Sequence, residues 1–267
     1  MDPGSINSPS HPLLKAFSKL QNSRRYRKKA GRIALEGPNL VTEALKAGLS
    51  PEVVFFSDEY YKNVGRSIAA GLPGSVRQYI MSPRLFKKIA DTEAPQPVAA
   101  IFYYNRNVFE RELYRPPGLA LLLDRLQDPG NMGTIIRTAA GAGAEVVYYT
   151  AGSTDPFGPK VLRATAGTVF HLRLEEVSDP LQLIGELKKG GLQVAAAAAG
   201  AENLYWKVDF RPPTALIVGN EAGGIAAELL LEADLRVAIP LHGKVESLNA
   251  AAAAAVLLYE IVRQRSI

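Results

Sequence analysis

The sequence predicts an α/β protein in two parts, a small N-terminal α/β unit and a larger C-terminal unit built on a doubly wound parallel sheet. Three observations lead to this fold class. Short apolar segments alternate with longer segments of helical spacing along most of the chain, as in α/β proteins. Several apolar segments after residue 118 are continuous runs, such as Leu119–Leu123, which suit strands buried on both faces of a parallel sheet. A polar segment that ends in Pro116-Pro117-Gly118 separates the two parts and is typical of a linker.

The N-terminal part covers residues 1–105 and opens with a basic segment, residues 1–32. Leu13, Leu14, Phe17 and Leu20 recur there at helical spacing, so we expect a short amphipathic helix. A small α/β unit follows over residues 33–105. Helices are expected at 12–23, 38–47, 60–70 and 83–90, and strands at 33–35, 53–56, 76–80 and 98–104.

The C-terminal part covers residues 119–267 and follows a linker at residues 106–118. Its apolar runs leave room for helices between them, which is the pattern of a parallel sheet. Strands are expected at 119–123, 146–150, 169–174, 192–199, 215–218 and 235–239, and helices at 131–142, 159–166, 180–189, 225–232 and 247–263. The alanine-rich last helix is expected to be buried nearly all round. Ligands of such sheets bind outside the carboxyl ends of the strands.

The composition excludes several classes of protein. The chain has no cysteine, which rules out disulfides, thiolate metal sites and cysteine nucleophiles. No apolar run reaches the length of a membrane span, and the N-terminus lacks the apolar core of a signal peptide. We therefore expect a cytoplasmic protein that does not enter a membrane. The three histidines stand far apart, without the spacing of a metal site, so no metal is expected.

Positive charge is concentrated in the N-terminal part. Residues 1–105 carry 15 lysines and arginines against 8 acidic residues, whereas residues 106–267 carry 16 against 18. A solvated basic surface is the simpler interpretation of one charge run. The absence of any acidic residue between Pro3 and Leu35 favours contacts to the phosphates of a nucleic acid. The candidate contacts are Lys15, Arg24, Arg25, Arg27, Lys28, Lys29 and Arg32, together with Lys160 and Arg163, which lie one helical turn apart in the C-terminal part.

Three polar motifs follow strands of the C-terminal part. In order, they are Asn131-x-Gly133-x-x-x-Arg137-x-Ala139, Gly219-Asn220-Glu221-x-x-Gly224 and Ile239-Pro240-x-x-Gly243-x-x-x-Ser247-Leu248-Asn249. Taken singly, each has an ordinary explanation as a helix cap, a surface ion pair or a turn. Their shared position at the strand ends of one sheet favours a binding site. The glycine-rich second motif is neither a dinucleotide fingerprint nor a Walker loop, which argues against nicotinamide cofactors and nucleoside triphosphates.

These motifs resemble those of the SpoU (TrmH-like) RNA 2′-O-ribose methyltransferases of the SPOUT superfamily. The resemblance implies an α/β catalytic domain with a C-terminal trefoil knot, S-adenosylmethionine as methyl donor, and a homodimer with its active sites at the interface. The N-terminal part is similar to the L30e-like substrate-binding domain of that family. By the same resemblance, the cofactor-binding residues are Gly219, Asn220, Ile239 and Leu248, and the catalytic residues are Asn131, Arg137, Glu221, Ser247 and Asn249. The chain departs from the family pattern at Ala250–Ala255, after the third motif.

The resulting hypothesis is an enzyme that uses S-adenosylmethionine to methylate a ribose 2′-hydroxyl, with ribosomal RNA favoured as the substrate and transfer RNA left open as an alternative. Transfer from a sulfonium needs the hydroxyl aligned with the methyl group and a route for its proton. Arg137 is the candidate for the proton step, either as an unusual base or by steering a phosphate that takes the proton. The second version is chemically easier because arginine is normally always protonated. Two alternatives are a non-catalytic RNA-binding or ribosome-assembly protein on the same fold and, with less support, a nucleotide-binding oxidoreductase.

Overall fold

The structure, a computed structural model, describes residues 3–90, 95–103, 116–243 and 245–266. The chain divides into two compact units. The first comprises Met1–Val108 and Phe157–Phe170, and the second comprises Phe109–Pro156 and His171–Ile267. The expected linker at residues 106–118 lies outside the described residues apart from 116–118. None of the described helices is long and apolar enough to cross a membrane.

The first unit contains a five-stranded sheet in the order β1-β4-β3-β5-β2. Its strands are β1 (Gly4–Ile6), β2 (Arg32–Glu36), β3 (Pro51–Ser57), β4 (Arg77–Met81) and β5 (Val98–Tyr103). β5 is antiparallel to β2 and β3, whereas β4 is parallel to β1 and β3. β1 was not expected from the sequence, because Ile6 is the only large apolar residue of this short strand.

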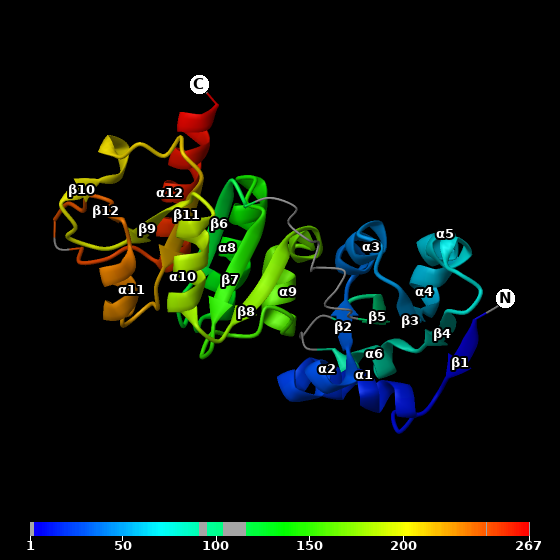
Figure 1. Cartoon of the computed structure of the whole chain (residues 1–267). Helices are drawn as coiled ribbons and strands as arrows, with labels where there is room; N and C mark the ends of the chain where they lie inside the picture. Colours follow the sequence, from blue (N-terminus) through cyan, green and yellow to red (C-terminus); the bar gives the residue numbers. More distant parts are fainter. Residues whose placement is uncertain (1–2, 91–94, 104–115, 244, 267) are drawn as a thin grey trace. The chain divides into compact units, whose positions relative to one another are not determined.

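Two helical layers cover this sheet (Figure 1). One layer consists of α1 (Pro12–Asn22), α2 (Arg24–Ala30) and α6 (Pro83–Ile89), and the other of α3 (Pro38–Lys46), α4 (Asp58–Tyr60), η1 (Tyr61–Gly65) and α5 (Arg66–Gly71). Phe17 of α1 and Phe86 of α6 share an apolar core with Phe55 of β3. The next residue, Phe56, packs on the other side against Tyr61, with 5.6 Å between ring centroids. Successive strand residues point to opposite faces, so these two phenylalanines each anchor one layer.

The second unit contains a seven-stranded sheet in the order β10-β12-β9-β11-β6-β7-β8. Its strands are β6 (Leu119–Leu123), β7 (Val146–Thr150), β8 (Arg173–Val177), β9 (Gln193–Ala197), β10 (Asn203–Leu204), β11 (Thr214–Val218) and β12 (Leu235–Ala238). All the strand pairings in this sheet are parallel. The predicted parallel sheet is therefore confirmed.

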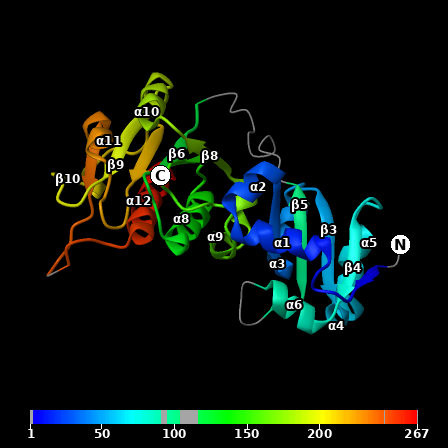
Figure 2. The same ribbon diagram turned by 90° about the horizontal axis from the view of Figure 1, so that it is seen from below.

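Helices cover both faces of the parallel sheet. They are α8 (Pro129–Gly141), α10 (Pro180–Lys189), α11 (Ala227–Glu232) and α12 (Ala250–Arg265), with a short turn η3 (Tyr205–Lys207). Figure 2 shows α10 and α11 on one side of the sheet and α8 and α12 on the other. The remaining helix, α9 (Pro159–Thr165), belongs to the segment grouped with the first unit.

The strand expected at residues 169–174 is wrong. A 3₁₀ turn, η2 (Thr168–His171), occupies the first half of this range, and β8 begins only at Arg173. The left-handed conformations of Ala166 and Gly167, with φ of 50° and 92°, end α9 and redirect the chain into the turn. β8 itself is an edge strand with polar residues, so its sequence lacks the apolar run that marks the other strands.

The expectation that α12 is buried nearly all round does not hold in the single chain. Ala254, Leu257 and Leu258 are fully buried, but Ala252 is exposed and Tyr259 is 53% exposed. Ala252 and Tyr259 are seven residues apart and therefore lie on one face of the helix. This face is apolar and open in the single chain.

Candidate active site

The first polar motif lies at the start of α8, beyond the carboxyl end of β6. The Asp128 side chain accepts a hydrogen bond from the amide of Asn131 (2.7 Å) and caps the helix, and Pro129 occupies the first helical position. Both residue types are favoured there. Asn131 therefore does not cap the helix, although it begins the range over which this helix was expected. Asn131 instead sits in the first turn and is only 8% exposed.

The second motif is a tight loop after β11. Asn220 and Gly224 exchange two backbone hydrogen bonds of 3.0 and 2.9 Å, and Oδ1 of Asn220 accepts two more from amides within the loop. A Cβ atom at Gly219 would lie 2.3 Å from the backbone of Gly224, a separation that no side chain can occupy. The glycine therefore allows the loop to close on itself and to present Glu221.

A chain of side-chain hydrogen bonds joins all three motifs. Oδ1 of Asn249 accepts from the amides of Ala251 (2.9 Å) and Ala252 (3.2 Å) and caps α12. Because this oxygen faces donors, Nδ2 of Asn249 is the atom that donates to Oδ1 of Asn131 (2.8 Å). Nδ2 of Asn131 in turn donates to the Glu221 carboxylate (3.1 Å). Each donor thus points from the helix towards the carboxylate, and each amide fixes the orientation of the next.

Glu221 is the acceptor at the end of this chain. Its two oxygens also accept from the backbone amides of Gln127 (3.2 Å) and Asp128 (3.0 Å). Burial would raise the pKa of Glu221, but the hydrogen bonds from Asn131 and from backbone amides outweigh it and hold the pKa below the ordinary value. The carboxylate is therefore ionised at neutral pH and places a negative charge at this edge of the sheet.

Asp124 and Arg125, which the sequence patterns did not single out, form hydrogen bonds at the same carboxyl edge of the sheet. Asp124 is 3% exposed, and it accepts from the amide of Ala226 (2.9 Å) and the hydroxyl of Thr150 (3.3 Å). Arg125 has a φ of 51°, which is rare for a residue with a side chain. In this conformation its amide donates to Oγ1 of Thr150 (2.8 Å), its carbonyl accepts from Asn220 (2.8 Å), and its guanidinium pairs with Asp124 (2.9 Å). The only sequence signal for this cluster is an aspartate that ends a buried apolar strand.

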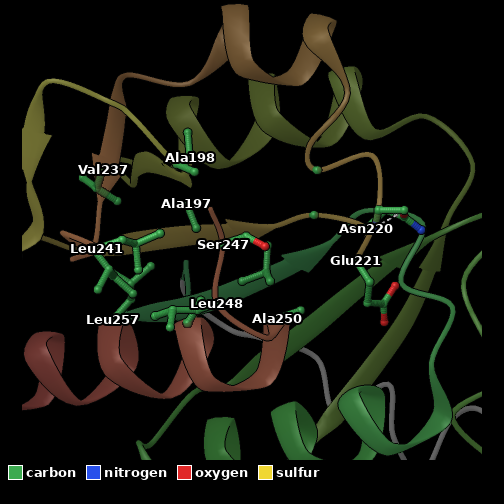
Figure 3. Close-up of a pocket in the computed structure, with 17 residues that line it drawn as sticks. Ala197, Ala198, Asn220, Glu221, Val237, Leu241, Ser247, Leu248, Ala250 and Leu257 are labelled. Atoms are coloured by element: carbon green, nitrogen blue, oxygen red, sulfur yellow. Dashed lines mark hydrogen bonds between the residues drawn. The ribbon is translucent and has the colours of Figure 1, made fainter. Parts of the chain in front are cut away.

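A pocket lies beside this network, between the strand ends and the start of α12 (Figure 3). Leu241, Leu248 and Leu257 gather at one end of the pocket, Ser247 lies near the middle, and Glu221 lies at the opposite end (Figure 3). The pocket therefore has an apolar end and a polar, negatively charged end.

The lining chemistry fits S-adenosylmethionine better than a phosphorylated cofactor. Among the described residues that line the pocket there is no lysine or arginine, and Glu221 is the charged one. A pyrophosphate would face this carboxylate without a cation to balance it, whereas a cationic ligand is attracted. The residues predicted to hold the cofactor all line the pocket: Gly219, Asn220, Ile239 and Leu248. The part of the chain that the structure describes contains no cluster of three or more histidines and carboxylates suited to a metal ion.

The structure brings most of the predicted catalytic residues together. Asn131, Glu221 and Asn249 are joined by hydrogen bonds, and Ser247 lines the pocket with Glu221. Ser247 precedes the cap, so α12 does not begin there as expected. Arg137 lies apart from this group. It is exposed on α8, does not line the pocket, and forms no hydrogen bond or ion pair with a described residue. Six residues after Asn131, it projects from a different face of the helix.

The predicted phosphate contacts divide into outward-facing and inward-facing residues. Exposed positions are held by Lys15, Arg25, Lys28, Lys29 and Lys160, and half-buried ones by Arg24 and Arg163. Arg27 is only 7% exposed, and its guanidinium donates to the carbonyls of Leu20 and Gln21 at the end of α1. Arg32 pairs with Glu52 (2.7 Å). These two arginines hold parts of the first unit together.

Comparison with known proteins identifies both parts of the chain. The SpoU rRNA Methylase family matches residues 118–259, and the MRM3-like substrate binding domain matches residues 11–100. The chain belongs to the SpoU rRNA methylase family. The predicted family is confirmed, and the two matched ranges correspond to the second and first sheets described above.

One curated relative and two solved structures are similar to this SpoU chain over nearly their whole length. The 23S rRNA (guanosine(2553)-2′-O)-methyltransferase RlmP of Bacillus subtilis is 35% identical over 256 residues, which are 96% of this chain and 98% of that protein. The crystal structure of the SpoU methyltransferase AviRb from Streptomyces viridochromogenes in complex with AdoMet matches with a TM-score of 0.87 and 27% identity, over 96% of this chain and 98% of that one. A crystal structure of an RNA 2′-O ribose methyltransferase matches with a TM-score of 0.83 and 33% identity, over 98% of this chain and all of that one. The predicted α/β fold and the prediction of an S-adenosylmethionine-dependent methyltransferase of this family are confirmed.

Proposed function

We propose that this chain transfers the methyl group of S-adenosylmethionine to a ribose 2′-hydroxyl of ribosomal RNA. The observation that carries the proposal is the pocket at the carboxyl edge of the parallel sheet, which no described lysine or arginine lines and which ionised Glu221 borders. The similarity to RlmP, which is named a 23S rRNA methyltransferase, supports ribosomal RNA over transfer RNA as substrate.

The apolar end of the pocket is assigned to the adenine ring, and backbone groups of Gly219, Ile239 and Leu248 to the hold on the cofactor. The cofactor supplies an electrophilic methyl group on a cationic sulfur. Glu221, at the opposite end, attracts the cationic part of the ligand. Asn131 and Asn249 keep the third motif in place, so that Ser247 faces the incoming ribose. This arrangement positions the hydroxyl, which is a large part of what methyl transfer requires.

Arg137 is assigned to the proton step. A guanidinium stays protonated under ordinary conditions, so it would steer an RNA phosphate whose oxygen accepts the proton of the 2′-hydroxyl as the methyl group passes from sulfur to the hydroxyl oxygen. The position of Arg137, exposed on α8, leaves its side chain available for a phosphate. In this proposal the RNA substrate supplies the proton acceptor of the site, and it does so from outside the pocket.

A homodimer is the proposed active form. Val245, Leu248 and Tyr259 are 55%, 38% and 53% exposed around α12, and an exposed apolar surface of this kind is typical of an interface. α8 packs beside α12, so Arg137 borders the same surface. A partner subunit docked there brings Arg137 towards a pocket of the dimer. Tyr259→Glu should yield monomers in light scattering and lose methyl transfer; a dimeric variant would contradict this interface.

The two matched family ranges support a division of labour along the chain, with residues 1–105 binding RNA and residues 119–267 carrying the catalysis. The exposed and half-buried cations of α1 and α2 that the sequence predicted are the proposed phosphate contacts: Lys15, Arg24, Arg25, Lys28 and Lys29. A trefoil knot at the C-terminal end is proposed as well, supported by the insertion of β12 between β9 and β10. The proposed substrate places the protein in the cytoplasm, where ribosomes are assembled.

Incubation with tritium-labelled S-adenosylmethionine and unmodified RNA transcripts tests the proposal. Label should enter ribosomal RNA. Label in transfer RNA alone would change the substrate, and label in neither would favour the non-catalytic RNA-binding protein. Arg137→Ala should abolish transfer while cofactor binding, measured by calorimetry, survives. Loss of cofactor binding in this variant would contradict the role given to Arg137.

A further inference from the structure

The helical layer formed by α1, α2 and α6 carries charge of one sign. These three helices contain no aspartate or glutamate. Their outward-facing and half-buried cations are Lys15, Lys19, Arg24, Arg25, Lys28 and Lys29 on α1 and α2, and Arg84, Lys87 and Lys88 on α6. The layer on the other face of the sheet is balanced, with Glu43, Asp58 and Glu59 against Lys46, Lys62 and Arg66.

The cations of α6 adjoin those of α1. Phe17 of α1 and Leu85 and Phe86 of α6 belong to one apolar core on the same face of the sheet. Helices that share a core in this way present their remaining faces to the same side, and Figure 1 shows α1, α2 and α6 on one side of the strands. Arg84, Lys87 and Lys88 are exposed, and none forms an ion pair with a described residue.

On the opposite layer the cations are already engaged. Lys46 pairs with Glu43 (2.9 Å) and Lys62 with Asp58 (2.6 Å). Arg66 lies over a tyrosine ring of the same layer, 5.9 Å from its centroid. The two layers therefore differ in sign, and the α6 cations of the first layer also differ from these three, because none of them pairs with a described residue. Only the first has the character of a polyanion-binding surface.

We infer that the α1–α2–α6 layer is the RNA-binding face of the first unit and that Arg84, Lys87 and Lys88 contact RNA phosphates. The inference rests on the proposed function, because it takes the RNA substrate as the polyanion. It goes beyond that function in assigning the contact to one face of the unit and to a helix far in sequence from the basic N-terminal segment. Such contacts set the position of the RNA and leave the reading of its sequence to other groups.

Two matched triple variants test the assignment. R84A/K87A/K88A on α6 and K46A/K62A/R66A on the opposite layer remove the same charge from exposed positions. The affinity of each full-length variant for an unmodified 23S rRNA transcript is measured across a range of salt concentrations. Each phosphate contact contributes roughly 0.7 to 0.9 to the slope of log K against log salt. The α6 variant should lose about 2 from this slope and bind at least about tenfold more weakly near 0.1 M salt, while the control keeps the wild-type slope.

An α6 variant with the wild-type slope, or a control variant that loses as much slope, would overturn the assignment. Thermal unfolding by circular dichroism reports whether each variant is folded; if the triple variant fails this check, the single alanine variants carry the same test. Methyl transfer separates this inference from the proposed function. Wild-type protein that binds RNA through this face without methylating it would contradict the function alone. If the wild-type protein methylates RNA and the α6 variant binds RNA as tightly as the wild type, only the assignment of the RNA-binding face is contradicted.

Discussion

Asn249 connects the cap of α12 to the pocket network, so its replacement should cost both stability and activity. Asn249→Ala removes the acceptor for the amides of Ala251 and Ala252 and the donor to Asn131. Loss of an N-cap costs about 1 kcal/mol, and loss of a hydrogen bond costs about 1 kcal/mol more. The sum of about 2 kcal/mol corresponds to a fall in Tm of roughly 4–8 °C for a domain of this size.

Asn249→Ser separates the two contributions. Serine caps helices well but is too short to reach Asn131, so this variant should lose only about 1 kcal/mol. Thermal unfolding by circular dichroism measures both values, and tritium transfer should fall in both variants because Asn131 is no longer held. A Tm of Asn249→Ala within about 1 °C of wild type, against the expected fall, would refute the network. So would a serine variant as unstable as the alanine variant.

Three further predictions concern the surroundings of the pocket. The free energy of unfolding of Arg125→Gly should be about 1 kcal/mol higher than that of Arg125→Ala, because only glycine adopts a φ of 51° freely. Equal free energies of unfolding in urea would contradict this. Gly219→Ala should abolish cofactor binding in calorimetry, because its Cβ would lie 2.3 Å from the backbone of Gly224; unchanged affinity would count against the loop as a pocket wall. Because its pKa is lowered, ionised Glu221 should stabilise the folded protein. This contribution is complete above the ordinary pKa of 4.5 and is lost as the pH falls through the lowered pKa. The stability gap between wild type and Glu221→Gln should therefore narrow in acid, and a gap independent of pH would refute the assignment.

The parallel sheet could be predicted because its strands are continuous apolar runs. Leu119–Leu123 and Thr214–Val218 are buried at every position, and this leaves an unambiguous trace in the sequence. β10 could not be predicted, because a strand of two residues, Asn203–Leu204, has no periodicity to detect. The predicted position of β8 was wrong for a related reason. Its alternating polar residues carry a weaker strand signal than the apolar residues of the turn before it.

The position of the site could be predicted, but its internal contacts could not. Glycine, asparagine and serine at strand ends indicate a site, whereas the partner of each side chain depends on the folded geometry. The hydrogen bond from Asn249 to Asn131 joins residues 118 positions apart. The outward position of Arg137 could not be predicted for the same reason. Helical spacing gives the directions of side chains relative to one another, but not which face of the helix the rest of the protein covers. Alanines in α12 likewise do not tell which side of the helix a neighbour covers.

Mapping of 2′-O-methyl groups in ribosomal RNA tests the claim on which the other inferences depend. RNA from cells that lack this protein is compared with RNA from cells that carry it, and with RNA from cells that carry Arg137→Ala. A ribose methylation of ribosomal RNA should disappear without the protein, return with the wild-type chain and stay absent with the variant. A ribosomal RNA methylation map that is identical in all three would contradict the proposed activity.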